Sequence, residues 1–174
     1  MTASNMFMLR CKWVWALQRA FRPYGKTMTS QASKVSVAEM QAFFMENFKG
    51  DRGELPRFDH IEDGKLTLSM TTGIANMRPS PDGLNSFVSG PTQMQLADHA
   101  AYAVIFTRAG IVPMAMTTNL NIDFLRPCIG PDIIAEAEII QLGRFRAIIS
   151  VEIRGKDSAK PASRSTVTYA MPRS

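Results

Sequence analysis

The alternation of apolar and polar residues predicts one long buried helix near the middle of the chain. The stretch 91–108 follows Gly90 and precedes Gly110, which is where helix start and stop residues belong. Between Met94 and Phe106 it is apolar nearly all the way round, which is typical of a helix enclosed by protein.

Shorter elements are predicted before this helix. Ser36 and Glu39 form a capping-box pattern that opens a short helix. The alternation at 65–71 follows a turn signal and predicts a hairpin with residues 58–61. Residues 73–88 contain several Gly and Pro residues, and we expect them to form a loop that leads into the long helix.

After Gly110 the apolar period changes to two, which predicts four strands. The first strand has Met114, Met116, Thr118, Leu120, Ile122 and Phe124 on one face and Thr117, Asn119, Asn121 and Asp123 on the other. The later alternations lie at 133–139, 145–153 and 165–171, and their short connections favour a meander. A sheet with one apolar face and an enclosed helix bury each other when the sheet wraps the helix. The order therefore predicts an α+β protein with the hot-dog fold, an antiparallel sheet around the helix 91–108.

Charge changes this picture only at the N-terminus. Residues 1–38 hold six basic residues and no acidic one, which leaves 14 of the 20 basic residues against all 15 acidic ones. A near-neutral body argues against nucleic-acid binding. We therefore divide the chain into a basic amphipathic extension, 1–35, and a domain, 36–174. The extension resembles a mitochondrial presequence if the source is eukaryotic, and an upstream extension before Met28 or a surface-lying segment are the alternatives.

The remaining composition argues against a metal or disulfide framework. Two separated cysteines and two histidines offer no ligand set, and we expect neither a metal nor a cofactor. No apolar run is long enough to span a bilayer. We expect a cytoplasmic protein, or one of the mitochondrial matrix if the extension is a presequence.

One carboxylate, Asp98, stands in the middle of the long apolar helix. An ionised side chain there is costly unless something offsets it, so Asp98 is a candidate catalytic group. A carboxylate held by a neighbouring hydroxyl, or exposed at the helix edge, is the structural alternative, and the residues alone leave both open. His99 points about 100° away from Asp98 and is interpreted as structural.

Gly90 is the second candidate. The N–H groups at a helix start are unpaired and lie at the positive end of the helix dipole, so they can polarise a carbonyl oxygen. Pro91 has no N–H, which leaves Gly90 and Thr92 as donors; alternatively, Gly90 only eases the junction between loop and helix. Eight helical residues separate Gly90 from Asp98, about 12 Å along the axis, so one carbonyl group cannot contact both within one chain. In a two-fold dimer with antiparallel helices, Gly90 of one chain can approach Asp98 of the other.

Two linked motifs carry a resemblance. They are Gly90-Pro-Thr-Gln-Met-Gln-Leu-Ala-Asp98-His-Ala and Thr117-Thr-Asn-Leu-Asn-Ile-Asp-Phe-Leu-Arg-Pro127. At this spacing the chain resembles, over roughly residues 36–172, the hot-dog acyl-CoA thioesterases of the phenylacetic-acid-pathway (PaaI) type. The resemblance implies hydrolysis of an acyl-CoA to a free acid and CoA. Asp98 would be the nucleophile or general base, Gly90 the oxyanion donor, and Thr117 a hydroxyl that positions water.

The chain also departs from that family pattern. Ser89 stands where the family has a histidine, and Pro91 replaces its second glycine. The family asparagine before this motif has no aligned counterpart, and Asn85 is the nearest substitute. The expected substrate-binding residues are Asn85, Ser89, Thr92, Met94, Tyr102 and Arg126. The candidate cations for the CoA phosphates are Arg126, Arg144, Arg146, Lys156, Lys160 and Arg164.

Three functions are therefore compared. The first is a homodimeric or homotetrameric acyl-CoA thioesterase, in which CoA is part of the substrate and no nucleic acid or integral membrane segment takes part. The second is a non-catalytic acyl-CoA binding or sensing module, which would have no need for the Asp98 carboxylate. A hot-dog dehydratase is less favoured, because its histidine–acid pair would require His99, which faces elsewhere.

Overall fold

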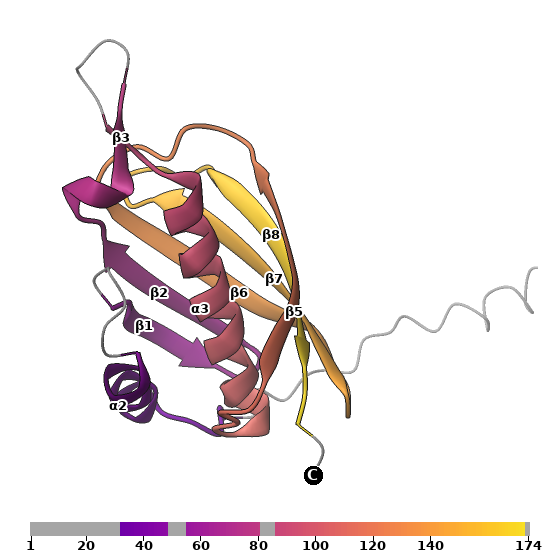
Figure 1. The fold of residues 1–174 in the computed structure, drawn as a ribbon. Helices are drawn as coiled ribbons and strands as arrows, with labels where there is room; N and C mark the ends of the chain where they lie inside the picture. The colour runs from indigo at the N-terminus through magenta and orange to yellow at the C-terminus, as the bar shows by residue number, and fades with distance from the viewer. Residues whose placement is uncertain (1–31, 49–54, 81–85, 173–174) are drawn as a thin grey trace, which may run out of the picture.

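The computed structural model describes residues 32–48, 55–80 and 86–172 (Figure 1). Most of the predicted extension 1–35 and the candidate Asn85 lie outside these residues. The chain forms two α-helices, α2 (Val37–Asn47) and α3 (Gly90–Ala109), and a short 3-10 turn, η1 (Ile74–Asn76), in the part described. The strands are β1 (Arg57–Glu62), β2 (Lys65–Thr71), β3 (Met77–Pro79), β4 (Ser86–Val88), β5 (Met116–Phe124), β6 (Asp132–Leu142), β7 (Arg146–Gly155) and β8 (Ser163–Ala170).

The main sheet is antiparallel and has six strands in the order β1-β2-β6-β7-β8-β5. The hairpin of β1 and β2 and the succession β6, β7, β8 agree with the sequence prediction. The predicted meander of four strands is wrong at its start, because β5 pairs with β8 and not with β6. Helix α3 lies between β2 and β5 in the sequence. In the sheet, β2 borders β6 at one side of the β6-β7-β8 unit, and β5 borders β8 at the other side.

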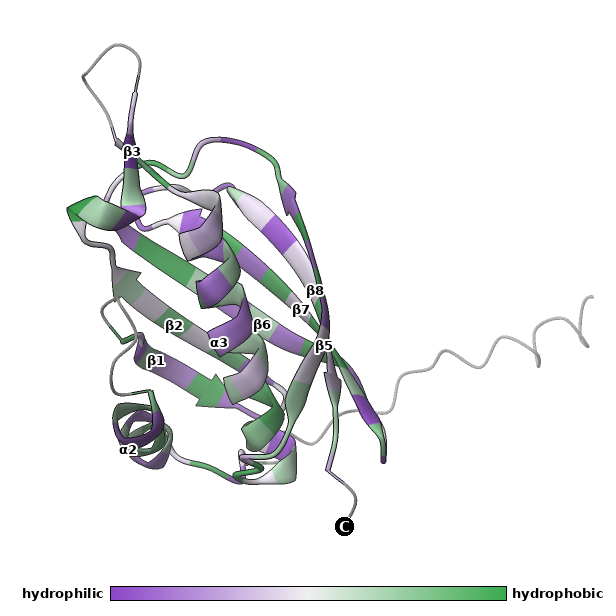
Figure 2. Cartoon of the chain, viewed as in Figure 1, coloured by the Kyte–Doolittle hydropathy of each residue, from purple (hydrophilic) through white to green (hydrophobic). Residues whose placement is uncertain are grey.

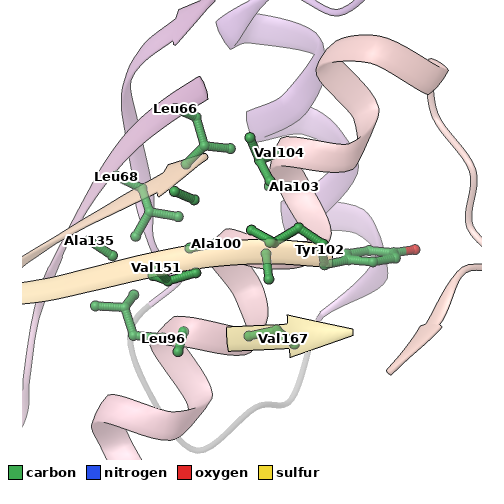
Figure 3. Close-up of a cluster of buried hydrophobic side chains, with 14 of the residues drawn as sticks. Leu66, Leu68, Leu96, Ala100, Tyr102, Ala103, Val104, Ala135, Val151 and Val167 are labelled. Carbon is green, nitrogen blue, oxygen red and sulfur yellow. The ribbon is translucent and has the colours of Figure 1, made fainter. Parts of the chain in front are cut away.

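Helix α3 lies across one face of this sheet, and α2 lies beside β1 (Figure 1). Hydropathy alternates along the strands of the main sheet (Figure 2). The apolar residues of β6 and β7, such as Ile133, Ala135 and Val151, are the buried ones. Figure 3 shows Leu96, Ala100 and other α3 side chains packed against sheet residues, while the Tyr102 ring points away from this cluster. The sheet around an enclosed helix is the predicted hot-dog arrangement.

Residues 73–88 differ from the predicted loop. Their described parts form η1 and the two-stranded sheet of β3 and β4, in which Met77 pairs with Val88. Strands of three residues, one of them containing Pro79, are too short to show a period of two. The Val88 N–H donates to the Cys128 carbonyl at 2.9 Å, which ties this small sheet to the segment between β5 and β6.

Capping residues define both ends of α3. Ser89 is the N-cap residue, and its Oγ accepts a hydrogen bond from the Thr92 N–H at 3.4 Å. At the other end, Gly110 adopts φ 81°, a left-handed conformation that favours glycine. None of the described helices is both long enough and apolar enough to cross a membrane.

Candidate active site

Asp98 projects from the middle of α3 and is half-buried. Two hydroxyl groups donate to the same carboxylate oxygen, Oδ1: Thr117 Oγ1 at 2.8 Å and the Tyr169 hydroxyl at 2.6 Å. No described residue donates to the second oxygen, Oδ2. The hydroxyl contacts that the sequence left open as a structural alternative are thus present. Both reach one oxygen of the Asp98 carboxylate and leave the other oxygen available.

A β-bulge brings Thr117 to this site. The register of β5 shifts between Thr117 and Asn119, so that Thr117 lies opposite Tyr169 and Leu120 lies opposite Val167. Tyr169 and Val167 are buried on the helix face of β8, and paired residues share a face of the sheet. The strict alternation predicted for 114–124, with Thr117 and Leu120 on opposite faces, is therefore wrong because of the inserted residue.

Tyr169 reaches Asp98 from β8, 71 residues along the chain. Its side chain is 2% exposed, and its ring stacks on that of Tyr102 with centroids 5.9 Å apart. Burial, and then the negative charge of Asp98, raise the pKa of the Tyr169 phenol well above its usual range. The phenol therefore remains protonated and acts as a hydrogen-bond donor at physiological pH.

A cavity of about 260 Å³ opens beside these groups. It is lined by Phe48, Asp98, His99, Tyr102, Ala115, Thr117 and Tyr169. Its aromatic wall comes from α2, whose C-cap residue Phe48 approaches the Tyr102 ring at 6.1 Å between centroids. A carboxylate thus borders a small apolar cavity, which is the usual composition of a small-molecule site.

Gly90 lies at the other end of the same side of α3. The Thr92 N–H is already used by the Ser89 cap, whereas the Gly90 N–H has no acceptor among the residues that the structure describes. A Cβ on Gly90 would lie 3.2 Å from Cζ of Phe124, so the ring of this β5 residue leaves little room for a side chain. The first helical N–H therefore remains available for an oxygen atom of a ligand.

An open strip connects the two ends. Along the first half of α3, Pro91 and Met94 are exposed and Gln95 and Asp98 are half-buried, at the spacing of one helix face. On the helix face of the neighbouring edge strand β5, Phe124 pairs with the buried Ser163 of β8 and is 51% exposed. The single chain therefore leaves this face of the predicted enclosed helix uncovered.

The other predicted residues occupy several places. The Ser89 and Thr92 hydroxyl groups are hydrogen-bonded to each other at 2.8 Å as part of the helix cap, and Met94 lies on the open strip. The Tyr102 hydroxyl donates to the Pro113 carbonyl at 3.1 Å while its ring lines the cavity. Arg126 donates to the Pro161 carbonyl and, with Lys160, lines a second cavity of about 360 Å³.

His99 is buried among aromatic rings, 5.1 Å from the centroid of Phe48 and 5.8 Å from that of Phe44. It lines the cavity beside Asp98, although the sequence interpretation assigned it a structural position elsewhere. Asp98 and His99 therefore border the same cavity, although they are neighbours on the helix.

Comparison with known proteins gives this geometry a family context. The sequence model of the thioesterase superfamily matches residues 85–162, a segment that contains Gly90, Asp98 and Thr117. This chain has the hot-dog thioesterase fold. A crystal structure described as that of a thioesterase from Silicibacter sp. TM1040 is 28% identical, with a TM-score of 0.71 over 83% of this chain and 96% of that one. The family match and this relative support a thioester hydrolase.

More distant structures share the fold. A thioesterase variant from Pseudomonas aeruginosa is 21% identical, with a TM-score of 0.63 over 79% of this chain and 94% of that one. A thioesterase described as phenylacetic acid degradation-related, from Ralstonia eutropha JMP134, is 18% identical, with a TM-score of 0.59 over 74% of this chain and 99% of that one. No curated protein sequence matches this chain. The PaaI type stays a prediction.

Sequence reasoning did not find Tyr169 or Phe48 as site residues. Tyr169 lies in a regular strand alternation and Phe48 closes a short helix. A position in the hydrophobic core is enough to explain either pattern. Contacts over 71 residues leave no local signal, so only the folded sheet shows that Tyr169 and Asp98 meet.

Proposed function

We propose that this protein is an acyl-CoA thioesterase that hydrolyses its substrate at sites shared by two protomers. The observation that carries the proposal is the half-buried Asp98 carboxylate, held through Oδ1 and open at Oδ2, at the mouth of an apolar cavity. A carboxylate beside a small cavity suits a reaction in which water or the carboxylate itself attacks a carbonyl carbon.

As general base, Asp98 Oδ2 takes a proton from a water molecule while the water oxygen attacks the thioester carbon. The carbonyl oxygen gains negative charge and accepts a hydrogen bond from the Gly90 N–H, aided by the positive end of the α3 dipole. The C–S bond then breaks, the sulfur leaves as the CoA thiolate and takes up a proton, and the acid is released. As nucleophile, Asp98 would attack the same carbon and expel the CoA thiolate as the C–S bond breaks, which leaves a mixed anhydride. Water then hydrolyses the anhydride to the free acid and the Asp98 carboxylate.

Both groups act on one carbonyl only if they come from different protomers. Within the chain, about 12 Å of helix separates Gly90 from Asp98. Both residues lie along the open strip of α3 and β5, one at each end. A two-fold axis through this strip would place each protomer's Gly90 near its partner's carboxylate and would cover the exposed Phe124 side chain.

We assign the two ends of the substrate to different cavities. The acyl group enters the cavity between Phe48, Tyr102 and Asp98, whose wall is aromatic. For the CoA phosphates, Arg126 and Lys160 are the strongest of the predicted cations, because they line one cavity and neither has a carboxylate partner among the described residues. The predicted cations Lys156 and Arg164, by contrast, pair with Asp132 and Glu152.

The test is release of free thiol from short-chain, long-chain and aromatic acyl-CoAs, followed with a thiol reagent. We expect turnover of at least one class, with product acid and CoA formed in equal amounts. Tight binding of acyl-CoA by calorimetry without thiol release would contradict the proposal and would indicate a binding or sensing module.

A further inference from the structure

Two hydroxyls converge on one oxygen of Asp98, although a carboxylate offers two. Thr117 approaches from the edge strand β5 and is exposed, whereas Tyr169 approaches from β8 and is almost fully buried. The Tyr169 oxygen also lies 3.1 Å from the Asp98 backbone carbonyl, but it has a single proton, and the 2.6 Å contact with Oδ1 is the shorter one. The buried phenol therefore donates to the Asp98 side chain and lies close to the backbone carbonyl of the same residue.

We propose that Tyr169 is a positioning residue for hydrolysis, which fixes Asp98 through Oδ1 and so makes Oδ2 the reacting oxygen. The inference rests on the proposed function. A rigid hydrogen bond at 2.6 Å selects one side-chain rotamer of Asp98, and reaction rates depend steeply on such placement. The exposed Thr117 hydroxyl competes with water for the same oxygen, so Tyr169 supplies the larger part of the restraint.

The surroundings of Tyr169 support a role in orientation. Its ring is fixed by stacking on Tyr102, whose own hydroxyl is engaged by Pro113. The other titratable groups that line the cavity are His99 from α3 and Tyr102. No lysine or arginine lines it, so hydroxyl groups are the described donors to the carboxylate.

The first experiment compares Tyr169→Phe with the wild type. The substitution keeps the ring and removes only the hydroxyl. Since a hydrogen bond to a charged group is worth more than a neutral one, we expect kcat to fall about tenfold to hundredfold. KM should change by less than about twofold, because the lost interaction orients a reacting group and does not hold substrate.

Ser165→Ala is the matched control. Ser165 is buried on the same face of β8, and its Oγ donates to the Val151 carbonyl at 3.4 Å without contact to Asp98. Removing this hydroxyl should leave kcat and KM unchanged. Equal losses in both variants would show that a buried hydroxyl in β8 matters only for the fold, and would overturn the inference.

A second variant serves if Tyr169→Phe does not fold. Site-specific 3-fluorotyrosine at position 169 keeps the shape and makes the phenol a stronger donor to Asp98, so kcat should change while KM stays within about twofold of the wild type. Unchanged kcat in the folded Tyr169 variants, while Asp98→Asn is inactive, would refute the role of Tyr169 and leave the proposed function intact. An inactive wild-type protein would instead refute the proposed function.

Discussion

The Asp98 carboxylate is tolerated inside a largely buried helix because hydroxyl groups replace part of its hydration. Hydrogen bonds to a charged group contribute about 1.5–3 kcal/mol each, enough to offset much of the cost of partial burial. Both donors come from strands remote in sequence, so neither is visible in the helix itself. The sequence could therefore single out Asp98 as unusual but could not decide how it is held.

Replacing Asp98 tests its chemical role most simply. Asp98→Asn keeps the shape and removes the proton acceptor, and we expect kcat for thioester hydrolysis to fall by about 10²–10⁴. Steady-state thiol release measures this. Asp123→Asn, the same change on an exposed β5 residue, is the control and should retain activity. A kcat equal to that of the wild type in Asp98→Asn would remove this carboxylate from the mechanism.

The oxyanion role of Gly90 can be tested by deleting its N–H. Proline suits the first position of a helix, and Ser89 before it has the extended conformation (φ −65°, ψ 153°) that proline requires. Because Pro91 would disfavour a helical proline before it, the variant is Gly90→Pro with Pro91→Ala. We expect kcat to fall by about 10²–10³, the usual loss for one oxyanion donor.

Pro91→Ala alone is the matched control, since it keeps the Gly90 N–H and should retain activity. Circular dichroism and the thermal midpoint confirm that the helix is intact in both variants. If the double variant hydrolyses the substrate as fast as the control, the Gly90 N–H is not the oxyanion donor.

At the scale of the elements, patterns with local causes were predictable and long-range pairings were not. The capping box at Ser36 and Glu39 and the glycine after α3 fix the helix ends through neighbouring residues, and the structure confirms both. The position of β5 depends on which strand edge is open after β6, β7 and β8 have paired, and no local residue encodes this. The bulge that turns Thr117 toward Asp98 likewise breaks a regular alternation without a glycine to mark it.

The cap of α2 gives a prediction about stability. The Ser36 Oγ accepts from the Glu39 N–H, and the Glu39 carboxylate accepts from the Ser36 N–H at 2.9 Å. Ser36→Ala should lower the free energy of unfolding by about 1 kcal/mol, because a helix N–H loses its acceptor. Urea denaturation measures the change, with Thr166→Ala on the exposed face of β8 as the control. An unchanged midpoint would show that this cap is not formed in solution.

The end of α2 gives a prediction about the acyl group. Phe48 walls the cavity beside Asp98 and stacks on Phe44, with centroids 4.8 Å apart. Phe48→Ala should widen the cavity and raise kcat/KM for longer acyl-CoAs relative to short ones by about fourfold for each additional methylene buried, since a buried methylene contributes about 0.8 kcal/mol. Met45→Ala, an exposed change on the same helix, should leave this ratio unchanged. An identical acyl profile in both variants would place the acyl group elsewhere.

At the scale of the whole molecule, the open strip of α3 and β5 is the feature that a single chain leaves unfinished. It carries Asp98 at one end and Gly90 at the other, with the exposed Phe124 side chain of β5 beside Gly90. An edge strand with exposed apolar residues is a surface that proteins usually cover. A second copy would cover it and complete both sites, which is the central claim of the proposed function.

The most direct measurement of this claim uses two inactive variants in one dimer. One protomer carries Asp98→Asn, and the other carries Gly90→Pro with Pro91→Ala; the two are co-expressed with different tags and purified as the mixed dimer. Shared sites would leave one complete site of two, so the mixed dimer should regain about half of the wild-type kcat. A mixed dimer as inactive as either parent would contradict the account, because both groups would then act within one chain.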